Sequence, residues 1–152
     1  MPESFRIVPA ASATLWVLAA VGLLLVGLTA LFGYTAYASR NTRFTVSVEG
    51  LRIQGDLYGR TIPLSELRTG EARALDLERE PQLRPRWRTN GVGLPGYLSG
   101  WFRLDNREKA LLFVTDRKKV VYIPTTRGYA VLLSVAEPER FLSALRADRQ
   151  HG

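Results

Sequence analysis

The chain opens with one long apolar segment and continues as short segments in which apolar and polar residues alternate. No charged residue stands between Arg6 and Arg40. About 20 apolar residues in a helix are enough to cross the ~30 Å hydrocarbon layer of a membrane. Trp16 and Phe32 lie near the two ends of this segment, and aromatic side chains are common at membrane surfaces. We therefore predict an N-terminal flank at residues 1–11, a transmembrane helix at residues 12–38 and a soluble domain at residues 40–152.

A cleaved signal peptide is the main alternative for the apolar segment. Residues 36–38 (Ala-Tyr-Ala) match the small-x-small pattern of a cleavage site, and cleavage would release a secreted or periplasmic domain. The apolar segment is longer than the about 7–15 residues of a signal peptide's hydrophobic region. The residues before it are only weakly basic, because Glu3 offsets Arg6. Both features favour an uncleaved anchor.

Flanking charge predicts the orientation of this anchor. Cytoplasmic flanks of membrane helices carry an excess of Lys and Arg. Only Arg6 precedes the apolar segment, whereas Arg40, Arg43 and Arg52 follow it. We therefore predict that the N-terminus lies outside and that the soluble domain is cytoplasmic.

Small residues recur along one side of the predicted transmembrane helix. Their spacing of three or four residues places them on one helical stripe. Small side chains let two membrane helices approach closely, so self-association through this stripe is one hypothesis. The alternative is that Gly and Ala are simply common in such helices. The residues of the stripe are Ala19, Gly22, Val26, Thr29, Gly33 and Ala36.

The rest of the chain has the alternation of β-strands. Residues 43–48 and 51–54 alternate on either side of a Glu-Gly turn, which predicts a β-hairpin. After Pro138 the pattern changes to a helical period, which predicts a C-terminal helix at about residues 138–149. We predict a mainly β domain, an antiparallel sandwich or barrel of roughly seven strands with one helix. The further predicted strands are residues 60–64, 72–78, 100–104, 109–115, 119–123 and 129–135.

Several of these segments resemble the bacterial pleckstrin-homology (PH)-like domain family. The most specific resemblance is at residues 86–102, which contain the motifs Asn-Gly, Pro-Gly-Tyr and Gly-Trp-Phe. Residues 44–59, 109–115, 121–125 and 132–142 resemble further strands and the last helix of the family. The resemblance implies a seven-stranded, partly open antiparallel barrel capped by a C-terminal helix. It also implies frequent fusion to membrane segments, which suggests a bacterial inner-membrane location, and it implies no reaction.

Relatives of this fold bind phosphoinositides through basic residues in the first hairpin loop. The corresponding turn in this sequence is the short, acidic Glu49-Gly50. The resemblance therefore does not bring that lipid-headgroup site to this chain.

A segment rich in arginine, tryptophan and glycine is the candidate ligand-binding site. If residues 84–88 are extended, three arginine side chains project from one side and the tryptophan from the other. Arginine binds carboxylate or phosphate with two parallel hydrogen bonds, and glycine lets backbone N–H groups approach an anion. The alternative is a solvated edge strand with the tryptophan in the core. The candidate residues are Arg84, Arg86, Trp87, Arg88, Asn90, Gly91, Gly93, Tyr97 and Trp101.

Composition narrows the chemistry further. The chain has no cysteine, and its single histidine, His151, lies next to the C-terminus, where no rigid partner is expected. Disulfides and thiolate chemistry are excluded, and we expect no catalytic residues, no metal and no cofactor.

The charge distribution points to a binding role. Lys and Arg total 21 against 14 Asp and Glu, a net charge of +7. We rank first a non-enzymatic binding or adaptor module on the lipid bilayer that associates with itself or with an unknown protein partner. Anionic lipid headgroups are expected to contribute about 1 kcal/mol for each nearby base. Contact with nucleic acid ranks last, because charge alone is not specific.

Overall fold

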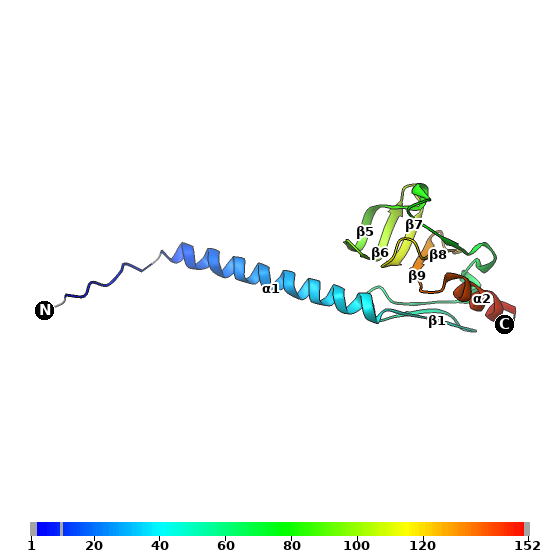
Figure 1. Cartoon of the computed structure of the whole chain (residues 1–152), viewed down its shortest axis with the longest axis horizontal. Coiled ribbons are helices and arrows are strands. Elements are labelled where there is room, and N and C mark those ends of the chain that lie inside the picture. Colours follow the sequence, from blue (N-terminus) through cyan, green and yellow to red (C-terminus); the bar gives the residue numbers. More distant parts are fainter. Residues whose placement is uncertain (1–2, 10, 151–152) are drawn as a thin grey trace. The chain divides into compact units, whose positions relative to one another are not determined.

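The computed structural model describes residues 3–9 and 11–150, so His151 and part of the predicted flank lie outside the described residues (Figure 1). The chain divides into two compact units between Tyr37 and Ala38. Helix α1 (Ser12–Asn41) makes up most of the first unit, and two β-sheets with helix α2 (Pro138–Gln150) make up the second.

Helix α1 has the length and composition of a membrane-spanning helix. It is the one described helix that is long and apolar enough to cross a membrane, and its most apolar window is not buried. The Thr29 hydroxyl donates to the Leu25 carbonyl oxygen at 2.8 Å, so this polar group is satisfied inside the helix, as a lipid environment requires. A Cβ atom at Gly22 or Gly33 would meet no other atom within 4 Å. Self-association through the stripe of small residues stays a prediction.

The second unit begins with a small antiparallel sheet in the strand order β1-β2-β3. The predicted hairpin is confirmed, because β1 and β2 pair from Arg43 opposite Gln54 to Ser47 opposite Gly50. Gly50 has a φ of 143°, and a Cβ atom there would lie 2.1 Å from the Ile62 carbonyl oxygen, so the turn requires glycine. The strands are β1 (Arg43–Ser47), β2 (Gly50–Gln54) and β3 (Thr61–Ile62).

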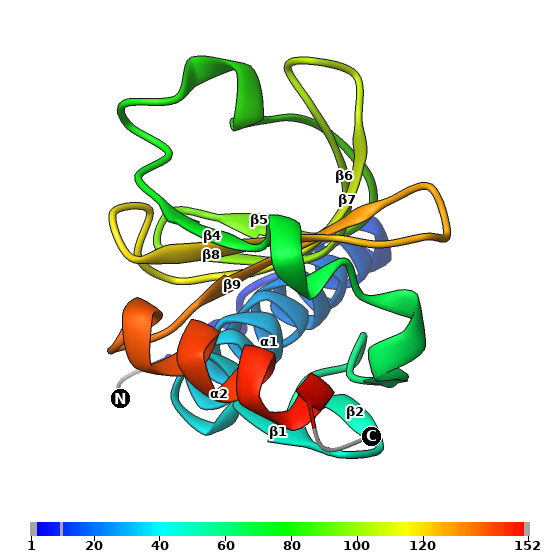
Figure 2. The ribbon, with the colours of Figure 1, turned by 90° about the vertical axis from the view of Figure 1, so that its right-hand side faces the viewer.

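A six-stranded sheet forms the rest of the domain, in the order β4-β8-β9-β7-β6-β5. All neighbouring strands are antiparallel except β7 and β9, which are parallel. In Figure 2, α2 and the β1–β2 hairpin lie on one side of this sheet, and the green segment around residue 80 lies on the other. The strands are β4 (Arg73–Leu75), β5 (Pro85–Leu94), β6 (Tyr97–Leu104), β7 (Lys109–Val114), β8 (Val120–Pro124) and β9 (Ala130–Ser134).

Both faces of the six-stranded sheet are buried by apolar residues. On the inner face, Leu111 packs in a cluster with Leu51 of β2 and Leu145 of α2. On the outer face, Leu112 packs in a second cluster with Leu77, which belongs to the segment connecting β4 to β5. Fully burying one such leucine contributes about 1.5–3 kcal/mol. The connecting segment therefore contributes apolar side chains to the core.

The expected seven-stranded, partly open barrel is not what the described residues form, since they contain nine strands in two separate sheets. Two features, one local and one of strand order, explain part of the difference. Pro63 has no amide hydrogen, and β3 ends at Ile62 just before it. Strand β9 inserts between β7 and β8, so it is parallel to β7 although it forms an antiparallel pair with β8. Alternation along the chain does not reveal this insertion.

Candidate functional site

A groove of about 330 Å³ lies on the outer face of the six-stranded sheet, beside its edge strand β5. Strand β5 supplies two arginines, a proline and a glycine, β6 supplies two apolar side chains, and the turn between β7 and β8 supplies a third arginine. We call this surface the arginine groove. It is lined by Pro85, Arg86, Arg88, Gly93, Leu98, Phe102 and Arg117.

Strand pairing explains why these residues share one face. Arg88 lies opposite Phe102 and Gly93 lies opposite Leu98 in the β5–β6 ladder. Directly opposite residues of an antiparallel pair project from the same face of the sheet. Phe102 and Leu98 are buried members of the outer cluster, so the arginines stand at the border of an apolar floor.

The arginines of the groove differ in their partners. Arg86 donates to Asp105 at 2.9 Å, and its guanidinium carbon lies 4.9 Å from the ring centre of Trp87. Among the described residues, neither Arg88 nor Arg117 forms an ion pair. The groove therefore carries positive charge that the domain does not neutralise.

The expected arrangement of residues 84–88 is wrong in two respects. Arg84 does not join the other arginines, because it precedes the strand and donates to the Leu77 carbonyl at 2.7 Å and to the Glu78 carbonyl. Trp87 does not project from the other face of the strand than Arg86, since the two side chains stack. Its 55% exposure also excludes the alternative of a core tryptophan. The pairing register shifts between Pro85 and Trp87, and such a bulge breaks the alternation on which the expectation rested.

The glycines of this segment serve the backbone of the hairpin. Gly91 and Gly100 face each other across the β5–β6 ladder, and a Cβ atom at Gly91 would lie 2.3 Å from the Ser99 carbonyl oxygen. Gly96 has a φ of 76° in the hairpin turn. Only Gly93 lies on the groove, and a Cβ atom there would make ordinary contacts, the shortest 3.6 Å to Phe102.

Three other candidate residues lie outside the groove. Tyr97 and Ser99 donate hydroxyl hydrogen bonds to the Asp56 carboxylate, the second at 2.6 Å. Tyr97 and Asp56 border a cavity of about 40 Å³, which has room for only a few water molecules. Asn90 accepts a hydrogen bond from the Tyr58 hydroxyl at 3.0 Å. Trp101 packs against the inner cluster.

Trp101 has two cations over its ring. The Arg60 guanidinium carbon lies 5.1 Å from the ring centre and the Lys109 amino nitrogen lies 4.5 Å from it. The Tyr129 ring meets it edge to face at 4.9 Å. The indole is therefore engaged by the domain's own side chains, which gives it a structural explanation.

Arg117 is the charged groove residue that the sequence did not reveal. It stands in the turn Asp116-Arg117-Lys118, which resembles any polar turn. Its placement beside β5 depends on β6 and β7 lying between these segments in the sheet. No local pattern records that placement.

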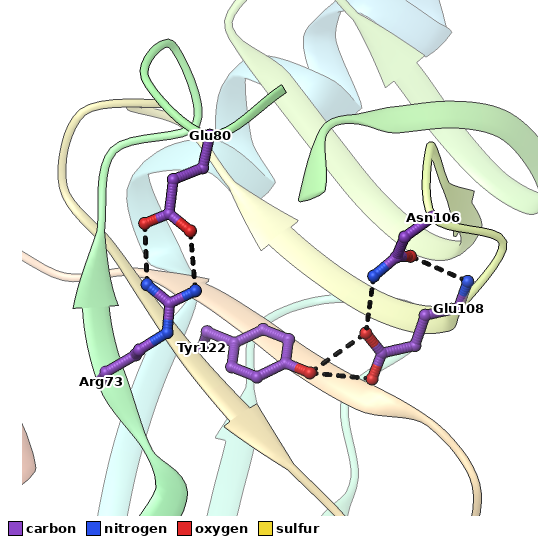
Figure 3. Close-up of polar contacts among 5 residues, drawn as sticks. All are labelled: Arg73, Glu80, Asn106, Glu108 and Tyr122. Atoms are coloured by element: carbon purple, nitrogen blue, oxygen red, sulfur yellow. Dashed lines mark hydrogen bonds and ion pairs between the residues drawn. The ribbon is translucent and has the colours of Figure 1, made fainter. Parts of the chain in front are cut away.

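A polar network elsewhere in the domain ties its segments together (Figure 3). The Tyr122 hydroxyl of β8 donates to Glu108, and burial together with this carboxylate raises the pKa of Tyr122 to about 12. Arg73 of β4 donates two hydrogen bonds to Glu80, at 2.7 and 2.6 Å, and these bonds lower the pKa of Glu80. Both carboxylates are thus held by neighbouring groups of the domain. In the described part of the chain, no group of three His, Cys, Asp or Glu residues has metal-binding geometry.

Comparison with known proteins identifies the domain. A family model described as "Bacterial PH domain" matches residues 42–149, more than half of the chain. No curated protein and no solved structure matches it. The matched range includes every strand of both sheets and all but the last residue of α2. The chain therefore belongs to the bacterial PH domain family.

Proposed function

We propose that the protein is a single-pass membrane protein whose PH domain is a non-enzymatic binding module, and that its arginine groove holds an anionic partner. One observation carries the proposal: Arg88 and Arg117 line one groove with an apolar border, and neither forms an ion pair among the described residues. Unneutralised guanidinium groups beside apolar surface favour carboxylate or phosphate ligands that also carry apolar groups.

The anchor is proposed to stay uncleaved. Helix α1 continues through residues 36–38 to Asn41. Ala38 is fully buried, and its carbonyl accepts hydrogen bonds from the Thr42 amide at 3.0 Å and the Thr42 hydroxyl at 2.7 Å. Cleavage after Ala38 would break this last helical turn. These contacts hold the cleavage position inside a regular helix, which supports an uncleaved anchor over a secreted or periplasmic product. The basic flank at Arg40 and Arg43 supports a cytoplasmic domain on an inner-membrane anchor.

A protein partner at the groove, or a second copy associated through the stripe of small residues on α1, is favoured over nucleic acid, with anionic lipid as an additional contact. Single-stranded nucleic acid is held by stacking bases on open aromatic rings. Phe102, the aromatic residue that lines the groove, is only 4% exposed. Trp87 does not line the groove, and the Arg86 guanidinium already lies against its ring. The groove therefore lacks an open aromatic platform for bases.

Photocrosslinking in native membranes tests the proposal. A photoreactive side chain at Pro95, an exposed position two residues from Gly93, is expected to yield a protein adduct. The variant Arg88→Gln should lose most of that adduct. Arg103→Gln is the matched control, because it removes one charge from the same hairpin at a residue that does not line the groove. Adducts to lipid alone, or equal yields in all three proteins, would contradict the proposed role of the groove.

A further inference from the structure

We propose that the arginine groove receives an extended acidic peptide, which joins the six-stranded sheet as an added strand along the free edge of β5. This inference rests on the proposed function and names the class of its partner. Strand β5 is the last strand in the sheet order. Within the described residues it pairs only with β6, and residues 86–94 make no backbone hydrogen bond to any other segment. Its outer N–H and C=O groups therefore remain free for a new strand.

The pairing register places the usable part of this edge next to the groove. Two bulges interrupt β5, between Pro85 and Trp87 and between Arg88 and Asn90. Bulges twist an edge away from regular pairing. From Asn90 to Leu94 the ladder runs without interruption opposite Trp101 to Tyr97. An added strand is therefore expected to pair along Asn90–Leu94, where the backbone is regular.

The side chains of the groove suit every second residue of such a strand. Alternate residues of an added strand project from the outer face, where the groove lies. Gly93 has no side chain there, so a residue of the added strand can reach the apolar floor formed by Leu98 and Phe102. Carboxylates at neighbouring outward positions come within reach of Arg88 and Arg117. Backbone pairing supplies affinity, and the arginines select for acidic side chains.

Charge and backbone chemistry argue against the other occupants of this edge. A second copy would bring its own Arg88 and Arg117 toward the same arginines, and like charges in contact oppose association. Nucleic acid has phosphates but no N–H and C=O ladder that continues a β-sheet. A lipid headgroup would satisfy the arginines and leave the strand edge unpaired. The acidic peptide is the occupant that uses both features.

The experiment uses the full chain in nonionic detergent micelles. The probe is a pool of peptides of about seven residues, long enough to cover Asn90–Leu94, with Asp or Glu at alternate positions and random residues between them. A second pool carries Lys or Arg at the same positions. Binding is measured by fluorescence anisotropy for the wild type, the double variant Arg88→Gln/Arg117→Gln and the control Arg103→Gln. Hydrogen exchange of the Asn90–Leu94 amides is measured with and without the acidic pool.

We expect the acidic pool to bind the wild type and Arg103→Gln alike and the double variant about tenfold more weakly. The bound peptides should slow exchange at Asn90–Leu94. The acidic peptides that bind should do so about tenfold more weakly after N-methylation of alternate backbone amides, because methylation removes the hydrogen-bond donors that a β-ladder needs. If the basic pool bound the wild type as tightly as the acidic pool does, the proposal would be overturned.

Other outcomes separate this inference from the proposed function. Arginine-dependent binding that N-methylation does not weaken and that leaves exchange unchanged would refute strand addition and leave an anion-binding groove. Arginine-dependent binding of glycerol phosphate, the headgroup of phosphatidylglycerol, or of single-stranded DNA, without peptide binding, would replace the peptide with another anion. If none of these probes depends on Arg88 and Arg117, both the inference and the proposed function fail.

Discussion

The Tyr122 hydroxyl donates to both carboxylate oxygens of Glu108, at 2.8 and 3.0 Å. This contact joins β8 to the residue just before β7, across strand β9, which lies between these two strands in the sheet (Figure 3). The phenol is held in its neutral, donating form, because ionisation would place a second negative charge beside Glu108 in a half-buried site. Burial is the largest cause of the raised pKa and the hydrogen bond to Glu108 is the next.

This contact predicts a loss of stability at alkaline pH. The pKa of Tyr122 is about 12 in the folded chain, above its ordinary value of 10.0. Its contribution to stability is therefore complete below pH 10 and is lost as the pH rises through 12. For a half-buried group we expect about 1–2 kcal/mol. Denaturant unfolding of the domain in micelles, followed from pH 9 to 12, should show this loss for the wild type and a smaller one for Tyr122→Phe.

The cause of the shift can be separated with a second variant. Glu108→Gln removes the charge and keeps the size of the side chain. The pKa of Tyr122 should fall only part of the way toward 10.0 in this variant, because burial remains. Spectrophotometric titration of the tyrosines measures this. A titration curve that matches the wild type would show that the carboxylate has no influence on Tyr122.

The ion pair between Arg73 and Glu80 predicts a loss of stability in acid. The hydrogen bonds from Arg73 lower the pKa of Glu80 below its model-compound value of 4.5. The pair therefore stabilises the fold above about that pH, and its contribution is lost as the pH falls through the lowered pKa. Glu80→Gln should lower the free energy of unfolding by about 1 kcal/mol at pH 7, a small cost because the pair is partly exposed, and by less at pH 3.

A matched control lies on the same connecting segment. Glu78 is more exposed than Glu80 and meets Lys118 only at 3.8 Å. Glu78→Gln should change the free energy of unfolding by less than about 0.5 kcal/mol at either pH. Equal losses for the two variants would show that net charge matters here and the paired geometry does not.

The glycines of the β5–β6 hairpin predict contrasting effects of alanine. At Gly91 the added Cβ atom would lie 2.3 Å from the Ser99 carbonyl oxygen, so the two strands must separate. We expect Gly91→Ala to cost about 1–3 kcal/mol in thermal or denaturant unfolding. At Gly93 the nearest atom is 3.6 Å away, and Gly93→Ala should change stability by less than about 1 kcal/mol. Similar costs at both positions would contradict the close approach of the strands at Gly91.

Features set by neighbouring residues were predictable from the sequence, and features set by bulges or strand order were not. The hairpin of residues 43–54 was predictable, because alternation and a Glu-Gly turn lie within one local stretch. Trp87 was misplaced because a bulge reverses the alternation, and nothing in the residues nearby marks its position. The arginine groove was only half predictable. Arg88 came from a local pattern, whereas Arg117 reaches it through strand order, which depends on long-range packing.

The absence of cysteine in this chain makes the orientation of the anchor directly measurable. Single cysteines at Ser4 and at Ser143, an exposed position on α2, provide one label on each side of α1. We expect a membrane-impermeant maleimide to label Ser4→Cys in intact spheroplasts and to label Ser143→Cys only after lysis, because the basic residues after α1 favour the cytoplasm. The reverse pattern would place the domain outside the inner membrane. Labelled Ser4→Cys must also run at the full mass of 17.0 kDa. If cleavage follows Ala38, Ser143→Cys runs as a shorter product without Ser4, and the membrane-anchored function proposed for the domain is refuted.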